Sequence, residues 1–386
     1  YNELLAVQAD LQRLSGASPY NSYRPGDRRG VVACGIAYNY LMENYPEGCG
    51  RTVLKISQYP LPVETLRRMV AECDEILVLE DGQPFVEEQL RGLLDESGKI
   101  KGRMSGELPR AGELTPDNVR AALGLPAAPV ADACARVVPR PPALCAGCGH
   151  RDVYEMLNEV AKEYENSKIF SDIGCYTLGA LPPFRAIDSC VDMGASITMA
   201  KGAADGGLFP SIAVIGDSTF THSGITGLVN IAYNESNATV IILDNSITGM
   251  TGHQQNPTTG FNLKGDPCTK IDLESLCRSV GIRRVRVVDP YDLAQCDAAV
   301  KEELAADEPS VIISRRPCAL LKYVKHKKPL AVDADKCRSC KMCMKIGCPA
   351  ISMTSGKAEI DNTLCTGCGV CEQLCKFDAL HAPKED

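Results

Sequence analysis

The chain has 386 residues, of which 45% are hydrophobic and 23% are charged, and its formal net charge is −8 at pH 7. This length allows two or three domains, each with its own core. No apolar run approaches the roughly 20 residues that cross a bilayer, and no block rich in lysine and arginine is present. These properties argue against a membrane-spanning protein and against a nucleic-acid-binding surface, so proteins and small molecules are the expected partners.

Cysteine is the residue type that departs most from ordinary composition, with 20 copies. No secretory segment opens the chain, and the cysteines gather in Cys-x-x-Cys groups, as thiolates do when they converge on a metal centre. Metal sites in a reducing cytoplasm are therefore a better explanation than disulfides. The chain starts at Tyr1 rather than at a methionine, so we expect a processed product or a fragment.

The first third of the chain predicts a lead-in or linker at residues 1–30 and a small α/β domain at residues 31–110. The acid pair Glu80-Asp81 follows one of its strands and is predicted to form a solvated turn. Alternating strands and helices imply a small parallel sheet. The expected strands are residues 31–35, 52–56 and 75–80, and the expected helices are residues 38–44, 63–73 and 84–95.

Residues 111–142 are rich in alanine and proline and predict a linker. Residues 143–325 alternate strands and helices again and predict the main α/β domain. Residues 211–215 and 239–243 are near-continuous apolar runs, which are typical of buried parallel strands, and a helix is expected between them at residues 223–237.

Polar groups follow both apolar runs. Gly216, Asp217 and Ser218 close the first, and Asp244 and Asn245 close the second. The carboxyl ends of parallel strands are where open sheets bind ligands. Carboxylate and amide oxygens suit Mg²⁺, which keeps phosphate oxygens among its ligands. Asp217, Asn245 and a backbone carbonyl near Ile247 could supply the protein ligands. A plain turn is the alternative for each residue alone.

This arrangement resembles the thiamine diphosphate signature, a Gly-Asp-Gly followed some 25 to 30 residues later by Asn. In this chain Ser218 stands in place of the second glycine.

The last segment, residues 329–386, predicts a bacterial-type ferredoxin domain with two 4Fe-4S clusters. A shift of 28 residues superposes Cys337, Cys340 and Cys343 on Cys365, Cys368 and Cys371, so the segment contains two repeats. The two-residue gaps let the three thiolates of one repeat wrap one cubane, and the fourth ligand comes from the other repeat. Zinc sites would leave cysteines over. An extra residue before Cys348 and Lys376 in place of a proline are departures from the usual run. The crossing assigns Cys337, Cys340, Cys343 and Cys375 to cluster 1 and Cys365, Cys368, Cys371 and Cys348 to cluster 2.

Several stretches, together with this tail, resemble the alpha subunit of the indolepyruvate ferredoxin oxidoreductase family. The stretches are CAGCGHR, SDIGCYTLG, MGAS, GDSTFTHSGITGLVN and LDNSITGMTGHQ, in this order. The resemblance covers the whole chain. It implies a thiamine-diphosphate-binding doubly wound parallel sheet, preceded by a transketolase-C-terminal-like α/β domain. It places Gly174, Gly194 and Ala195 with Gly216, Asp217, Ser218, Asn245 and Ile247 at the cofactor.

The resemblance also implies coenzyme A-dependent oxidative decarboxylation of an aryl 2-oxo acid, with ferredoxin taking the electrons. Thiamine diphosphate acts as the electron sink when CO₂ leaves, and clusters are needed because each accepts one electron at a time. Related oxidoreductases carry a cluster beside the diphosphate. Its ligands would here be Cys145, Cys148, Cys175 and Cys318. A free dithiol or a zinc half-site is the alternative for Cys145 and Cys148.

Three histidines lie inside the resembling stretches, namely His150, His222 and His253. His253, just past the Mg²⁺ motif, is the candidate catalytic residue, with a surface or core histidine as the alternative. The family implies a separate pyrimidine-binding domain or chain, a smaller beta subunit and an external ferredoxin, hence a hetero-oligomer. Two other functions stay open. One is a pyruvate- or 2-oxoglutarate-type oxidoreductase, and the other is a non-catalytic electron-transfer subunit.

Overall fold

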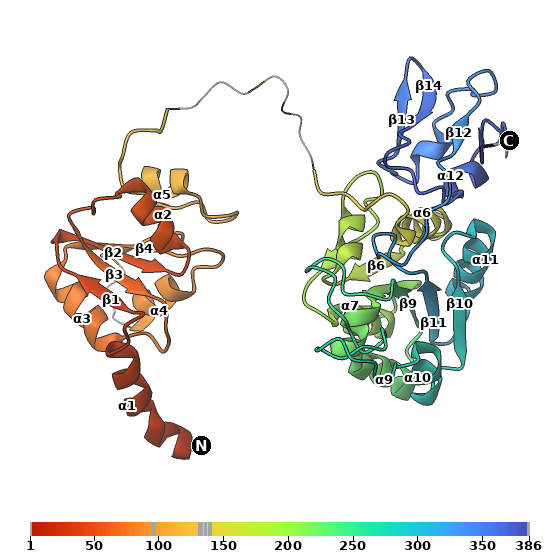
Figure 1. Ribbon diagram of the computed structural model, residues 1–386. Helices are drawn as coiled ribbons and strands as arrows, with labels where there is room; N and C mark the ends of the chain where they lie inside the picture. The colour runs from red at the N-terminus through yellow and green to blue at the C-terminus, as the bar shows by residue number, and fades with distance from the viewer. Residues whose placement is uncertain (1, 94–97, 130–133, 135–136, 138–140, 384–386) are drawn as a thin grey trace. The chain divides into compact units, whose positions relative to one another are not determined.

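The computed structural model describes residues 2–93, 98–129, 134, 137 and 141–383 (Figure 1). The chain forms two compact units, Tyr1–Val138 and Pro139–Asp386, which are described separately here. The predicted linker at residues 111–142 falls partly outside the described residues, as do the ends of the expected helix at 84–95 and of the expected tail at 329–386. Among the described residues no helix is both long and apolar enough to cross a membrane.

The first unit holds a five-stranded sheet in the order β1-β3-β2-β4-β5, in which only β1 runs antiparallel to its neighbour. Successive residues of a strand point to opposite faces. In β2, Val32 accordingly packs with helices α3 and α4, whereas Val31 and Ala33 pack with α2 and α5. The elements are α1 (Asn2–Gly16), β1 (Ser22–Arg24), β2 (Asp27–Cys34), α2 (Ala37–Asn44), β3 (Arg51–Ile56), α3 (Val63–Glu72), β4 (Glu75–Leu79), α4 (Phe85–Leu93), β5 (Ile100–Lys101) and α5 (Pro116–Ala122).

Two features of this unit differ from the sequence-based expectation. Part of the expected linker forms helix α5, which buries Val119. The Thr115 hydroxyl caps this helix by accepting a hydrogen bond from the backbone N–H of Asn118. The prediction that Glu80 lies in a solvated turn was wrong. Its side chain is buried and accepts the backbone N–H groups of Val86 and Glu87, so it caps α4.

The second unit is built on a six-stranded, fully parallel sheet in the order β10-β11-β9-β8-β6-β7. The central strands β8 and β9 are buried along their whole length, which explains their apolar sequences. The elements are α6 (Gly149–Ala161), β6 (Lys168–Ser171), η1 (Cys175–Ala180), β7 (Ser189–Cys190), α7 (Ala195–Asp205), β8 (Ser211–Gly216), α8 (Asp217–Thr219), η2 (Phe220–Gly224), α9 (Ile225–Asn234), β9 (Ala238–Asp244), α10 (Leu273–Ser279), β10 (Arg284–Val288), α11 (Leu293–Leu304) and β11 (Ser310–Arg315).

The strand order creates a topological switch point between β6 and β8. From β6 the chain moves outward to the edge strand β7, and from β8 it moves the other way, to β9. At such a point the connecting loops diverge and leave a crevice at the carboxyl ends of the strands, which is the general ligand site of open α/β sheets.

The tail consists of two short antiparallel pairs, β12 with β15 and β13 with β14. Its core is continuous with the core of the large sheet, because Ile346, Val370 and Leu380 belong to the same buried cluster as Val153 and Leu157 of α6. The elements are β12 (Ala331–Val332), η3 (Met342–Met344), β13 (Ile351–Thr354), β14 (Lys357–Ile360), α12 (Val370–Gln373) and β15 (Leu380–His381).

Candidate cofactor and cluster sites

A small cavity lies at the switch point. Six of the eight residues expected at the cofactor line it, namely Gly174, Gly216, Asp217, Ser218, Asn245 and Ile247. Two of the glycines are required by space, because a Cβ on Gly174 or Gly216 would lie 2.2 or 2.7 Å from the Tyr176 ring. The other two, Gly194 and Ala195, stand at the start of α7 and are not among the lining residues.

Asp217 follows β8 and is the buried carboxylate of this cavity. Its Oδ2 accepts hydrogen bonds from Asn256 Nδ2 at 3.2 Å and from Thr258 Oγ1 at 3.0 Å. Burial, and then the nearby charge of Asp244, raises the pKa of Asp217 to about 6. A cation beside this carboxylate would offset the cost of burying its charge. Asn256 and Thr258 were not singled out from the sequence, because they lie in a loop with no distinctive pattern.

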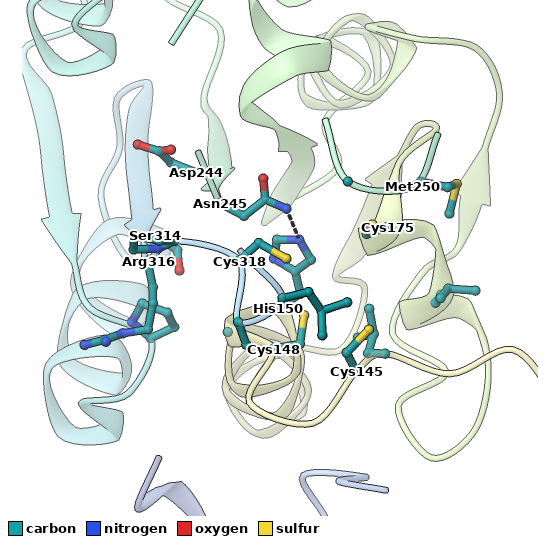
Figure 2. Close-up of a pocket in the computed structure, with 18 of the residues that line it drawn as sticks. Cys145, Cys148, His150, Cys175, Asp244, Asn245, Met250, Ser314, Arg316 and Cys318 are labelled. Atoms are coloured by element: carbon teal, nitrogen blue, oxygen red, sulfur yellow. Dashed lines mark hydrogen bonds between the residues drawn. The ribbon is translucent and has the colours of Figure 1, made fainter. Parts of the chain in front are cut away.

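Asn245 follows β9 on the other side of the cavity. Its Oδ1 accepts the backbone N–H of Ile247 at 3.2 Å, and its Nδ2 lies 3.4 Å from Nε2 of His150 (dashed in Figure 2). An amide oxygen has two lone pairs, so Oδ1 keeps one for a metal ion. Asp217 and Asn245 could thus hold Mg²⁺ if phosphate oxygens complete its coordination.

Asp172 is the functional residue that the sequence did not reveal. It follows β6 and is fully buried. Its Oδ2 accepts the Gly194 amide at 3.0 Å and the Ser196 hydroxyl at 2.7 Å, and its Oδ1 accepts the Tyr176 hydroxyl. Asp172 therefore joins the loop that carries Gly174 to the start of α7. It lies in the stretch SDIGCYTLG that carries the family resemblance, but its role follows only from its position at the end of β6 once the strand order is known.

A second and larger cavity of about 220 Å³ adjoins the first. All four cysteines that the resemblance implied for a third cluster line it, and Figure 2 shows Cys145, Cys148, Cys175 and Cys318 gathered about the His150 ring. One water needs roughly 10–15 Å³, so the space far exceeds a packing defect. Burial raises the pKa of Cys148 to about 12 and also raises those of the Cys175 and Cys318 thiols.

The two cavities share a wall. His150, Cys175, Asn245, Gly249 and Met250 line both of them. The cysteine cavity is thus in direct contact with the cavity at Asp217 through the same few side chains.

The spacing of the sulfur atoms bears on what the cysteines could bind. Among the described residues, no three histidine, cysteine, aspartate or glutamate side chains come close enough to hold a single metal ion. A tetrahedral zinc with bonds of about 2.3 Å needs its sulfur atoms within roughly 4 Å of one another. In a 4Fe-4S cluster each thiolate binds a different iron, so the sulfur atoms stand farther apart. The described residues thus give no support for a single zinc ion at these cysteines.

The histidines occupy three different environments. His150 is buried, and burial lowers its pKa to about 4, so its ring is neutral and Nε2 can accept from the Asn245 amide. His253 lines the cysteine cavity but is exposed, with Nε2 4.0 Å from the Cys318 sulfur. His222 is exposed and contacts Ser223. The catalytic assignment of His253 stays a prediction, and His150 is the histidine that lies between both cavities.

Two observations bear on the crossing expected for the tail cysteines. Cys375 lines one small cavity together with Cys337, Cys340 and Cys343. Burial and then the thiols of Cys368, Cys348, Cys365 and Cys343 raise the pKa of Cys371. The ligand assignment itself stays a prediction.

Two family models match the chain at these places. Residues 172–314 match "Thiamine pyrophosphate enzyme, C-terminal TPP binding domain", where thiamine pyrophosphate is another name for thiamine diphosphate, and residues 358–381 match "4Fe-4S binding domain". Together with the parallel sheet, these matches define the class: a thiamine-diphosphate-binding domain joined to an iron–sulfur domain.

Curated relatives narrow the class. Indolepyruvate oxidoreductase subunit IorA of Archaeoglobus fulgidus is 34% identical over 403 aligned residues, which is 99% of this chain and 64% of that protein. The IorA subunit of Thermococcus kodakarensis is 36% identical, covering 92% of this chain and 61% of that protein. The chain is therefore a homologue of subunit IorA of indolepyruvate oxidoreductase, and it spans about three fifths of the length of these relatives.

A solved 2-oxoglutarate:ferredoxin oxidoreductase from Magnetococcus marinus is also similar, at 19% identity and a TM-score of 0.42, over 48% of this chain and 68% of that chain. This likeness is too weak to support an argument about function.

Proposed function

We propose that this chain is the thiamine-diphosphate- and cluster-bearing part of a complex that oxidatively decarboxylates aryl 2-oxo acids such as indolepyruvate. Coenzyme A would accept the acyl group and an external ferredoxin the electrons. The observation that carries the proposal is the wall shared by the two cavities, in which Cys175 and Asn245 line both. A decarboxylase without electron transfer would not need a thiol-lined cavity beside its cofactor.

The residues at the switch point fit thiamine diphosphate and Mg²⁺. Asp217, Asn245 and the Ile247 carbonyl would hold the metal, and Gly174 and Gly216 line the same cavity and let the Tyr176 ring pack closely against their backbone. When bound, thiamine diphosphate supplies an electron sink for the loss of CO₂. In the tautomer with the proton on Nδ1, His150 would accept from the Asn245 amide through Nε2 and so orient the amide oxygen toward the metal.

The cysteines fit three clusters. Cys145, Cys148, Cys175 and Cys318 would hold the cluster nearest the diphosphate, and the eight tail cysteines would hold the other two. Clusters supply one-electron acceptors, which a two-electron oxidation needs in sequence. The residues around the cysteine cavity are largely apolar, including Leu144, Leu178 and Ala319, and they would keep water from the reduced site.

The expected partners are carried over from the similarity to the IorA proteins. We expect the complex to include a pyrimidine-binding domain or chain and a smaller beta subunit, with the first unit of this chain acting as a transketolase-C-terminal-like domain. The domain boundaries expected from the sequence, at residues 110, 142 and 325, belong to the same proposal.

An assay of the complete, anaerobically purified complex tests the function. Indolepyruvate, phenylpyruvate, pyruvate and 2-oxoglutarate are each supplied with and without coenzyme A, and the reduction of a redox dye is followed. We expect coenzyme A-dependent reduction with the aryl acids and at least tenfold slower reduction with the other two. Preference for pyruvate or 2-oxoglutarate would replace the substrate class proposed here.

Retention of the cofactor separates the enzyme from a pure electron-transfer subunit. The wild-type complex should retain thiamine diphosphate through gel filtration, and Asp217→Ala should lose it, because the variant lacks a metal ligand. A wild-type complex that binds no thiamine diphosphate would sink the enzyme proposal.

A further inference from the structure

Arg151 is a buried cation that the proposed chemistry leaves unexplained. It lies in the first turn of α6, directly after the segment that carries Cys145 and Cys148, and its residue is only 2% exposed. Arginine is rarely buried without a carboxylate or phosphate partner, because removing its charge from water is costly. A buried guanidinium at this place therefore needs a physical reason.

The guanidinium spans two cysteine-bearing loops. Its Nε donates to the carbonyl of Cys145 at 2.7 Å, and its Nη2 donates to the carbonyl of Leu144. On the other side its Nη1 donates at 2.9 Å to the carbonyl of Ile346, two residues before Cys348. Arg151 therefore links the loop of the first cluster site to the loop that supplies a ligand to tail cluster 2.

All three acceptors are neutral carbonyls. Among the described residues the guanidinium forms no ion pair, and the neighbouring Asp152, although buried, accepts no hydrogen bond from it. The groups that act on it electrostatically are the thiols of Cys348, Cys148 and Cys145, which belong to both cluster sites, and the neighbouring Asp152. Burial raises the pKa of Asp152 well above its usual range, and Asp152 accepts no hydrogen bond from Arg151, so the guanidinium lies between two cluster sites without a hydrogen-bonded carboxylate partner.

Lys345 provides a contrast at the same boundary. It also joins the tail to α6, but its Nζ lies 2.9 Å from Glu159 and 3.7 Å from Glu155, and its side chain is 38% exposed. Its charge is balanced and screened by water.

A buried charge beside a cluster affects electron transfer. Reducing a 4Fe-4S cluster adds one negative charge to an anionic centre, and the potential depends on nearby charge, hydrogen bonds and burial. A cation in a low-dielectric setting stabilises the reduced state, whereas a paired and hydrated cation does so much less.

We propose that Arg151 raises the reduction potentials of the two clusters that flank it, the one at Cys145 and Cys148 and the one that Cys348 serves. This inference rests on the proposed function, since it needs those clusters to be present. Arg151 acts through its charge, while its three hydrogen bonds keep that charge between the sites. The remaining cluster, at Cys337, Cys340, Cys343 and Cys375, does not depend on it.

The test compares Arg151→Gln, Arg151→Lys and Lys345→Gln with the wild-type complex. Each is purified anaerobically, its iron is counted, and its clusters are titrated potentiometrically with electron paramagnetic resonance as the readout. In Arg151→Gln we expect the ratio of reduced to oxidised cluster at a fixed potential to fall about tenfold for the two flanking clusters, which corresponds to about 59 mV. The third cluster should stay within about twofold, as should all clusters of Arg151→Lys and Lys345→Gln.

Several outcomes would overturn the proposal. They are unchanged potentials in Arg151→Gln at full iron content, an equal shift of all three clusters, or equal shifts in the glutamine and lysine variants. If Arg151→Gln does not fold, Arg151→Lys decides, because a tenfold change despite the retained charge would contradict the role. If neither variant keeps its iron, Arg151 is a structural brace and the proposal fails. A wild-type protein without the flanking clusters would instead be a failure of the proposed function.

Discussion

Asp172 and Asp217 follow adjacent strands and are both buried, yet their hydrogen bonds give them different roles. Asp172 accepts from Gly194, Ser196 and Tyr176 and so holds backbone in place. Asp217 accepts from two neutral side chains and faces the cavity. The first is a positioning residue, and the second is the one that gains most from a bound cation.

The raised pKa of Asp217 predicts a pH dependence for the metal-free protein. Its pKa is near 4 when unfolded and about 6 when folded. The folded state thus binds the proton more tightly, and this contribution to stability is complete below about pH 4 and lost as the pH rises through 6. One pKa unit is worth about 1.4 kcal/mol, so Asp217→Asn should stabilise the metal-free protein at pH 7 by about 3 kcal/mol.

Thermal unfolding between pH 4 and 8 measures this effect, with the exposed Asp266→Asn as control. Addition of Mg²⁺ with thiamine diphosphate should then stabilise the wild-type complex and not the Asp217→Asn complex. A variant that is less stable than wild type at pH 7 would contradict the electrostatic account.

Burial also raises the pKa of Asp172, while its hydrogen bonds from Tyr176, Ser196 and Gly194 lower it. In Asp172→Asn we expect the disruption of these hydrogen bonds to outweigh the relief of the buried charge, so the variant should be less stable. The amide replaces a buried carboxylate that accepts several hydrogen bonds, so we expect a loss of about 2 kcal/mol and weaker retention of thiamine diphosphate. The part-exposed Asp188→Asn is the matched control. The denaturation midpoint and the bound cofactor are both measured, and wild-type values for Asp172→Asn would show that the loop holds its shape without it.

At the scale of the elements, helix α6 connects the sites. Its N-terminus bears Cys148, its first turn bears His150 and Arg151, and its later residues Val153 and Leu157 pack with the tail.

Helices α7 and α9 cover the opposite face of the sheet, where the two helices approach each other closely. A Cβ on Gly227 of α9 would lie 2.9 Å from Ile197 of α7, whereas Gly202 of α7 faces open space.

The two glycines make a paired test of this packing. Gly202→Ala should stabilise the protein by about 0.5–1 kcal/mol, because it removes backbone entropy in a helix. Gly227→Ala should destabilise it by about 1–3 kcal/mol, because the methyl group overpacks the contact between α7 and α9. Chemical denaturation of both variants checks this, and equal effects at the two positions would mean that α7 and α9 separate easily.

At the scale of the whole molecule, the sequence predicted the features that depend on a local pattern of residues. The apolar runs identified β8 and β9, and their polar ends identified Asp217 and Asn245. It missed what depends on assembly. Asp172 matters because β6 lies next to β8, Glu80 is buried because it caps α4, and the prolines of the expected linker hid the short helix α5. The contacts of Arg151 could not be predicted either, because the Ile346 carbonyl that accepts its hydrogen bond is 195 residues away in the sequence.

The proposed electron path depends on a third cluster in the cysteine cavity, beside the cavity at Asp217, and an iron count tests for this cluster most directly. Iron is measured per chain in the anaerobically purified complex, in wild type and in Cys318→Ser. Three clusters of four irons predict about 12 iron atoms in wild type and about 8 in the variant, with the tail clusters intact. About 8 iron atoms in both proteins would mean that the cysteine cavity holds no cluster, and would contradict the account.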